Sequence, residues 1–175
     1  MDDPRPTTEA LQAALDRSRA ETRGAFENRA LMYAYLYEEL LPVLGRDETV
    51  AVMKRAIYRR GLEVGRKYRD AGQAGDLVEV GAIFCGGSPC AGGLFDPGVE
   101  ESSDGRIVLR MTSCPLVDAW RAAGLPDQEV DILCEIAAAV DEGTFAGAGL
   151  DLEFLSRIGA GENKCLLDLR VPAGE

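Results

Sequence analysis

Three cysteines in the second half of the chain are the residues whose types and positions could do chemistry. Cys114 precedes a proline that suits the first position of a helix, Cys134 lies inside the next predicted helix, and Cys165 begins the last predicted strand. A thiol at a helix N-terminus gains from the helix dipole, which lowers its pKa and makes it a better nucleophile. Cys114 is therefore the candidate nucleophile, with Cys134 and Cys165 as its partners.

The same three thiols are candidate metal ligands. Three thiolates that leave one position open suit zinc, or an iron–sulfur cluster with one open iron. The spacing of Cys114, Cys134 and Cys165 matches no standard ligand motif. Cysteines also pack in hydrophobic cores without any chemical role. The sequence is therefore compatible with three roles for these cysteines: nucleophile, metal ligand or core residue.

The chain contains no histidine, and this absence narrows the chemistry. It excludes Ser–His and Cys–His nucleophile pairs and every zinc site that needs imidazole. Proton transfer would then fall to carboxylates. Asp141 follows Cys134 by about two helical turns, so both lie on one flank of the same helix. Asp141 is the candidate catalytic acid and base, with Asp168 as the alternative.

Arg59, Arg60, Trp120 and Asp168 are the candidate substrate-binding residues. The two arginines belong to a basic run in an acidic chain, and a guanidinium that turns inward could bind a substrate carboxylate. The alternative is that the run forms a solvated face that balances acidic residues elsewhere. Cys85 and Cys90 belong to the glycine-rich segment 85–93, which we interpret as a mobile loop, since its spacing matches neither a CxxC nor a phosphate-binding motif.

Composition excludes several classes of protein. Apolar residues make up 46% of the 175 residues, enough for a core, and the net charge of −11 disfavours binding to nucleic acid or anionic membranes. No apolar run has the length of a membrane span, and the first residues are too polar and acidic for a secretory signal. We expect a single cytoplasmic domain over residues 1–175, with residues 1–7 flexible. An odd count of 5 cysteines argues against a disulfide framework.

Hydrophobic periodicity predicts the fold class. Predicted helices cover residues 8–24, 26–44, 47–69, 115–124 and 127 to the glycines between 143 and 149. Predicted strands cover residues 77–84, 106–112, 150–155 and 165–171, with a hairpin turn at residues 103–105. The result is an α+β fold, in which a helical N-terminal half packs on a small antiparallel β-sheet and two Cys-bearing helices are inserted between strands.

Several stretches are similar to a known family. In the N-terminal half they are residues 28–33 and 53–61 with Gly65-Arg66-Lys67. In the C-terminal half they are Ser113-Cys114-Pro115-Leu116, Leu133-Cys134-Glu135-Ile136-Ala137 and Asp141-Glu142-Gly143-Thr144-Phe145. Over most of residues 26–171 the chain resembles the L-2-amino-thiazoline-4-carboxylic acid hydrolase-like family. More distantly, it resembles the small-molecule-binding domains related to 4-vinyl reductase.

The resemblance implies hydrolytic ring opening of a thiazoline amino acid on the way to cysteine. The first hypothesis is a hydrolase that acts on the C–N or C–S bonds of a small cyclic amidine-like substrate through the three-cysteine site, so that Cys114→Ala abolishes activity. The alternative is a non-catalytic sensor or carrier that binds a small molecule, a metal or an iron–sulfur cluster. The expected partner is a small-molecule substrate, without nucleic acid or membrane, and a homodimer is a further option.

Overall fold

The computed structural model describes residues 7–172, which form a helical N-terminal half followed by a mixed C-terminal half. Its helices are α1 (Thr8–Leu44), α2 (Arg46–Gly65), α3 (Arg69–Gln73), α4 (Leu77–Gly86), α5 (Pro115–Ala122) and α6 (Asp127–Ala148). Short 3₁₀ turns cover η1 (Arg66–Tyr68), η2 (Pro89–Gly92) and η3 (Ile158–Ala160). The strands are β1 (Pro97–Ser103), β2 (Arg106–Met111), β3 (Asp151–Ser156) and β4 (Cys165–Arg170).

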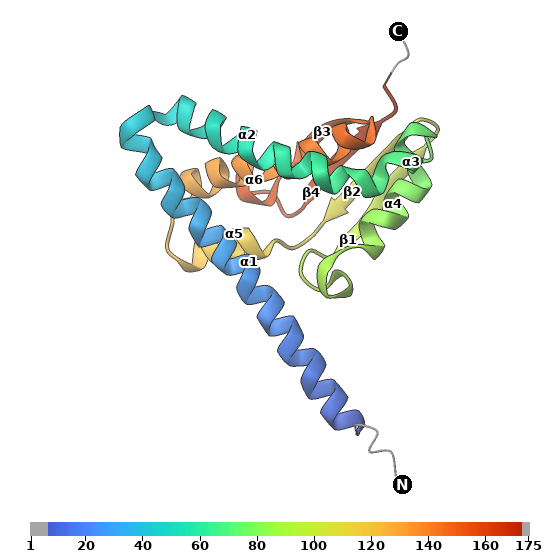
Figure 1. The fold of residues 1–175 in the computed structure, drawn as a ribbon, viewed down its shortest axis with the longest axis horizontal. Coiled ribbons are helices and arrows are strands. Elements are labelled where there is room, and N and C mark those ends of the chain that lie inside the picture. The colour runs from blue at the N-terminus through green and yellow to red at the C-terminus, as the bar shows by residue number, and fades with distance from the viewer. Residues whose placement is uncertain (1–6, 173–175) are drawn as a thin grey trace.

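The four strands make one antiparallel sheet in the order β1-β2-β4-β3. Helices α5 and α6 lie in the chain between β2 and β3, so they are inserted into the sheet sequence as predicted (Figure 1). The α+β fold class, with its helical N-terminal half and small antiparallel sheet, is confirmed. Among the described residues, no helix is long and apolar enough to cross a membrane.

Helix α1 is continuous where the sequence predicted two helices separated at Gly24. A single glycine costs a helix only about 1 kcal/mol, and strong helix formers surround Gly24 on both sides. The second half of α1 is held by the core through Ala30, Ala34 and Tyr37. The first half extends away from the rest of the molecule (Figure 1). Residues 1–6 of the segment predicted to be flexible lie outside the described residues, and Thr7 is the N-cap of α1.

The predicted strand at residues 77–84 is wrong, because this segment is helix α4. The Asp76 side chain accepts a hydrogen bond from the Glu79 backbone N–H at 3.0 Å, which caps the helix. Its buried residues, Leu77, Val80 and Gly81, have helical spacing, and a short apolar run cannot be assigned to strand or helix by periodicity alone. Helix α4 packs on β1 and β2. Cys85 is in the last turn of α4. The 3₁₀ turn η2 lies within segment 85–93, and the mobility of this segment stays a prediction.

Helix α6 continues through Gly143 and Gly147, where the sequence predicted that it would end. The reason is its packing against α2. A Cβ added at Gly143 would approach the Tyr58 carbonyl oxygen closer than 3.0 Å, and one at Gly61 would do the same to the Val140 oxygen. These glycines therefore serve close helix packing, not helix termination. Asp127 is the first residue of α6, and Pro126 occupies the N-cap position.

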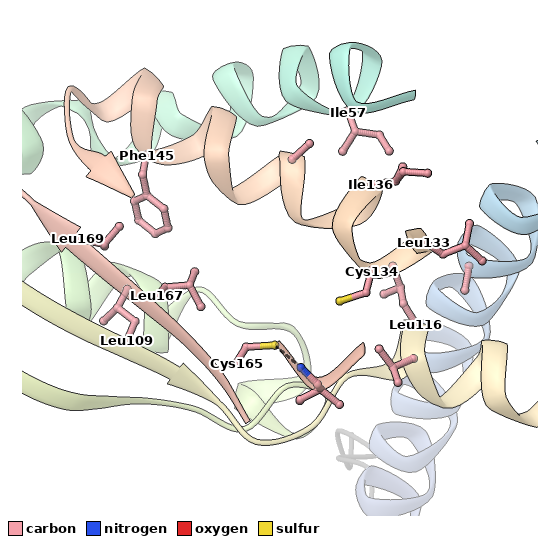
Figure 2. Packing of buried hydrophobic residues seen from close by; sticks show 14 of the residues in the cluster. Ile57, Leu109, Leu116, Leu133, Cys134, Ile136, Phe145, Cys165, Leu167 and Leu169 are labelled. Atoms are coloured by element: carbon pink, nitrogen blue, oxygen red, sulfur yellow. Dashed lines mark hydrogen bonds between the residues drawn. The ribbon is translucent and has the colours of Figure 1, made fainter. Parts of the chain in front are cut away.

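The core lies between the sheet and the helices. Leu109, Leu167 and Leu169 on the sheet face Phe145 of α6, and Leu133 and Ile136 extend the same core along that helix (Figure 2). Trp120 is fully buried, and its Nε1–H donates to the Ala30 carbonyl oxygen at 2.7 Å, which ties α5 to α1. Cys165, Leu167 and Leu169 are all buried on one face of β4, because alternate residues of a strand point to the same side.

Candidate active site

A cavity of about 470 Å³ lies between the helices and the sheet. Most of its wall is apolar and comes from α2, α4, α6 and the strands. Its apolar residues include Ile57, Phe84, Phe95, Met111, Val140 and Phe154. This size lies within the range of small-molecule sites, which are mostly apolar with a few placed polar groups.

The cavity places Cys134 and Asp141 in the same wall, as their spacing on one helix predicted. Asp141 contributes the only carboxyl group among the described residues that line the cavity. Burial and, to a smaller extent, the neighbouring charge of Glu142 raise the pKa of this carboxyl, and Arg29 partly offsets them, so that the pKa is about 7. Asp141 is therefore half ionised near neutral pH, which suits a group that both accepts and donates protons.

Cationic side chains dominate the charge of the cavity, although the chain as a whole is acidic. The described residues that line it include four cationic side chains and a single acidic one, Asp141. The four cations are Arg29, Arg60, Lys67 and Arg157. Arg157 is engaged by an ion pair of 2.9 Å with Asp131. Arg29, Arg60 and Lys67 are exposed, so they lie where the cavity meets solvent. Such a rim favours an anionic ligand.

Two tyrosines bring hydroxyl groups to the cavity. Burial, with smaller contributions from Asp141 and Cys85, raises the pKa of Tyr68 to about 12. Burial also raises the pKa of Tyr33, against a lowering by Arg29. Both phenols therefore stay protonated at neutral pH and can donate hydrogen bonds to a ligand oxygen.

Two of the three candidate cysteines line the cavity. The turn η3 supports both: the Ile158 N–H donates to the Cys165 sulfur at 3.3 Å (Figure 2), and the Gly159 backbone lies against Cys134. A Cβ added at Gly159 would meet the Cys134 side chain closer than 3.0 Å, so the close approach of the turn requires glycine. Burial raises the pKa of Cys165 to about 12 and that of Cys134 above its ordinary value.

Cys114 does not line the cavity and is half-buried beside Leu116, which does. It is the N-cap residue of α5, as predicted, and the backbone N–H groups of Val117 and Leu116 lower its pKa. Burial nevertheless outweighs them and raises the pKa of Cys114 to about 11. The expected lowering of this pKa is therefore wrong, because the helix contributes less than desolvation costs.

The metal hypothesis finds no matching geometry. Cys134 and Cys114 both influence the pKa of Cys165, so the three thiols lie within electrostatic range of one another. Within residues 7–172, however, no group of three or more cysteine or carboxylate side chains is close enough to hold a metal ion. The three cysteines therefore form no preassembled metal site in the part of the chain that the structure describes, and the metal hypothesis stays a prediction.

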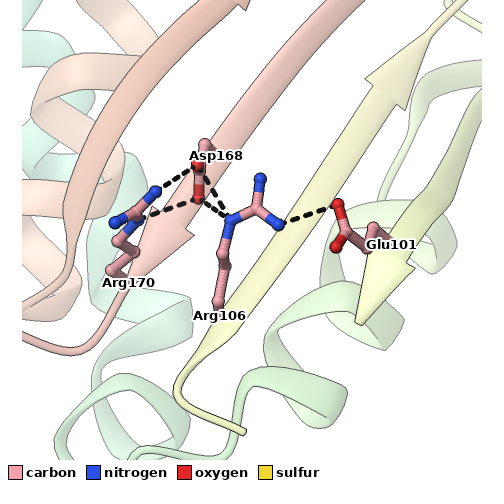
Figure 3. A network of polar contacts seen from close by, with 4 residues as sticks. All are labelled: Glu101, Arg106, Asp168 and Arg170. Atoms are coloured by element: carbon pink, nitrogen blue, oxygen red, sulfur yellow. Dashed lines mark hydrogen bonds and ion pairs between the residues drawn. The ribbon is translucent and has the colours of Figure 1, made fainter. Parts of the chain in front are cut away.

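The four predicted substrate-binding residues occupy different places. Arg60 lines the cavity and pairs with Glu63 at 2.9 Å, whereas Arg59 is exposed and lies outside the lining. Trp120 is the core residue that bonds to Ala30. Asp168 lies on the sheet, where Arg106 and Arg170 bind its carboxylate at 3.0 and 2.9 Å (Figure 3). The structure brings only Arg60 of these four to the cavity.

Asp168→Asn is expected to destabilise the protein by about 2–4 kcal/mol at pH 7, because it removes a buried carboxylate that neutralises two arginines. Hydrogen bonds from Arg170 and Arg106 lower the pKa of Asp168 in the folded state. The stability that the group contributes is thus present above its unfolded pKa of about 4 and is lost as the pH falls through the lower folded value. Urea unfolding at several pH values measures both effects.

Glu153→Gln is the matched control for Asp168. Glu153 is exposed and pairs with Asp168 in the β3–β4 register. Its loss should change the free energy of unfolding by less than about 0.5 kcal/mol. Equal effects of the two substitutions would show that the ion pairs of Asp168 do not stabilise the sheet.

Sequence reasoning missed Arg29, Lys67, Tyr33, Tyr68 and Arg157 as cavity residues. Lys67 belongs to the basic run noted in the sequence, but the run alone does not say which member faces inward. Arg29 lies on α1, far from the cysteines in sequence, and only the packing of α1 on the second half of the chain brings it near Asp141. The one sequence feature that could have pointed to Arg29 is its positive charge in an acidic chain.

Together, these features define an α+β protein with a cavity that combines a near-neutral carboxyl group with a cationic rim. The sequence model of the L-2-amino-thiazoline-4-carboxylic acid hydrolase family matches residues 25–169. The chain belongs to this family. A comparison with curated proteins gives no match.

Among solved structures, the fold is similar to that of a trafficking protein particle complex subunit 3 from Naegleria fowleri, described as covalently bound to palmitic acid. The two share 12% sequence identity, with a TM-score of 0.56 over 85% of this chain and 96% of the other. At this identity the likeness concerns the fold alone.

Proposed function

We propose that the protein hydrolyses a small sulfur- and nitrogen-containing heterocyclic amino-acid derivative, of the thiazoline-carboxylate type, in this cavity. The family supports a hydrolase of this kind. The observation that carries the proposal is the carboxyl group of Asp141, placed in an apolar cavity behind a cationic rim. A substrate carboxylate would pair with the rim, and the cyclic amidine carbon would lie beside Asp141.

In the proposed reaction, ionised Asp141 takes a proton from a water molecule as the water oxygen adds to the amidine carbon. The tyrosine hydroxyls lining the cavity can donate hydrogen bonds to that oxygen. Protonated Asp141 gives this proton to the ring nitrogen, which leaves a neutral tetrahedral intermediate with one hydroxyl group. When the intermediate collapses, Asp141 transfers the hydroxyl proton to the same nitrogen, the oxygen becomes a carbonyl and the ring C–N bond breaks. Both protons of one water thus end on the leaving nitrogen, and the carboxylate is regenerated.

The role of the cysteines within this proposal follows from their environment. Cys134 and Cys165 form part of the cavity wall and can contact the substrate sulfur. A thiol attacks as thiolate, and burial raises the pKa of all three thiols, which disfavours a covalent route through Cys114. The three-cysteine site stays a prediction, with direct attack by water as the favoured route.

The test is to incubate the purified protein with 2-amino-thiazoline-4-carboxylate and follow the gain of one water by mass spectrometry. We expect hydrolysis by the unmodified chain and by Cys114→Ala, with the variant within about threefold of the original, because Cys114 does not line the cavity. A folded but inactive Cys114→Ala protein would instead support the covalent route. The absence of hydrolysis for this and related cyclic amidines would refute the proposal.

A second candidate function is non-catalytic binding of a small apolar or sulfur-containing ligand. Two observations favour it: the cavity wall is mainly apolar, and the similarly folded trafficking subunit is described as covalently bound to palmitic acid. Ligand binding without turnover would support this candidate over the hydrolase. The homodimer stays a prediction, which light scattering of the purified protein can test.

A further inference from the structure

The cavity is larger and more apolar than a single thiazoline carboxylate needs. At about 470 Å³ it belongs with sites for drug-sized ligands, whereas an amino-thiazoline carboxylate is a compact polar molecule of fragment size. Such a small substrate would leave much of the wall formed by Phe84, Phe154 and Met111 against water. Covering this wall with apolar ligand surface would contribute about 25 cal/mol of binding free energy per Å² of apolar surface removed from water.

Two of the cationic groups of the cavity lie at its opening. Arg29 and Lys67 are exposed at the rim, and each is placed over an aromatic ring: the Arg29 guanidinium is 4.3 Å from the Phe26 ring centre and the Lys67 ammonium 4.8 Å from that of Tyr68. Phe26 in turn packs edge-on against Phe95 of the cavity wall at 5.2 Å. These contacts hold both cations at the opening.

The far side of the cavity is buried. Cys134 and Cys165 line it with only 8% and 7% of their surfaces exposed, beside η3. The cavity therefore runs from a cationic opening to a buried, mainly apolar end, where Arg157 lies beside Cys134 with its charge paired to Asp131. Asp141 is influenced by Arg29 at the opening and by Glu142 on the same helix. A ligand that matches this arrangement has an anionic head and an apolar body.

We propose that the site takes amphipathic carboxylates, whose carboxylate pairs with Arg29 and Lys67 and whose apolar substituent, larger than a heterocycle, fills the interior toward Cys134 and Cys165. This inference rests on the proposed function and deepens it by naming the substrate class. The substrate is then a cyclic amidine carboxylate that carries an apolar group.

Isothermal titration with butanoate, octanoate and dodecanoate tests the apolar part independently of turnover. Affinity should rise about fourfold for each added methylene until the interior is full, because each buried methylene contributes about 0.8 kcal/mol. Ala137→Phe, which places a ring in the cavity wall, should weaken dodecanoate binding more than butanoate binding. An affinity that does not depend on chain length would overturn the inference.

Octanol and the rim variants test the head group. Octanoate should bind the original chain more tightly than octanol does, and Arg29→Gln with Lys67→Gln should reduce its affinity about threefold to tenfold. The matched control Arg23→Gln with Arg66→Gln removes two exposed charges outside the cavity lining and should leave the affinity unchanged. Because all four positions are exposed, folding should not limit these variants. If both double variants lose octanoate affinity to the same extent, Arg29 and Lys67 are not the carboxylate-binding residues.

The two proposals can fail separately. If 2-amino-thiazoline-4-carboxylate is hydrolysed but an alkyl substituent on the substrate does not raise kcat/KM and the alkanoates do not bind, the amphipathic substrate class is wrong and the hydrolase stands. If the alkanoates bind with the expected chain-length dependence and no cyclic amidine is hydrolysed, the hydrolase is wrong and the amphipathic binding site stands.

Discussion

Asp141→Asn is expected to lower kcat for thiazoline hydrolysis by about a hundredfold to ten-thousandfold, the usual contribution of a positioned general base. In the original chain, kcat/KM should rise with pH through about 7, because only the ionised carboxylate can take a proton from water. The variant should lose this rise together with the activity. Steady-state rates across the pH range measure both effects.

The same substitution should have the opposite effect on stability. Because burial raises the pKa of Asp141 in the folded state, its ionisation costs stability as the pH rises from about 4 through about 7. Asparagine carries no charge to bury. Above pH 8 we therefore expect Asp141→Asn to stabilise the protein by about 1–3 kcal/mol, measured by urea unfolding. A variant that is less stable and less active would indicate a structural role only.

Glu142→Gln is the neighbouring control for Asp141. Glu142 pairs with Lys54 at 3.4 Å outside the cavity lining, and its charge raises the pKa of Asp141. Its removal should move the pH profile of kcat/KM toward lower pH while the maximal rate stays within about threefold. An unchanged profile would show that the group titrating in the rate is not Asp141.

Gly61→Ala is expected to destabilise the protein by about 3 kcal/mol or more. The added Cβ would meet the Val140 carbonyl oxygen, the Gly143 Cα and the Thr144 nitrogen closer than 3.0 Å. All three are backbone atoms, so no side chain can move aside, and α2 and α6 would have to separate. Thermal and urea unfolding measure the loss. Because Ile57 and Asp141 lie on these two helices, the cavity should also lose ligand affinity.

Gly24→Ala is the matched control for Gly61→Ala. Gly24 lies inside helix α1, and nothing lies within 4 Å of an added Cβ. Alanine there should stabilise the helix by about 0.5–1 kcal/mol, because it reduces the freedom of the unfolded backbone. Gly147→Ala should be intermediate, since its Cβ would lie 3.1 Å from the Leu62 carbonyl oxygen. Equal effects at Gly24 and Gly61 would contradict the close helix contact.

Local sequence features predicted the elements whose signals are local. The strand at β2 and the Cys-Pro start of α5 follow from alternation and proline placement, and the hairpin turn before Arg106 follows from Asp-Gly. The signals at Gly24 and Gly143 were misread because a glycine has more than one use. It can end a helix, or it can allow another helix to approach, and only the partner helix decides which.

The candidate site was predictable only in part, for a similar reason. Cys134 and Asp141 share a helix, so their common wall could be derived from helical geometry. Arg29 reaches the cavity through the packing of α1 on the second half of the chain, which no local pattern encodes. The position of Cys114 at a helix start predicts a lowered pKa, whereas its burial, which the sequence does not show, raises the pKa.

The close contact between α2 and α6 also bears on how the chain reaches its fold. Its partners are far apart in sequence, as in the bond from Thr144 to the Gly61 carbonyl across 83 residues, and the Trp120–Ala30 bond spans 90. Topologies built on such distant pairings fold more slowly than those with local contacts. During synthesis, the apolar faces of α1 and α2 stay exposed until α6 has been made and can pack against them. The site residues contributed by the two halves can therefore come together only late, once nearly the whole chain has been made.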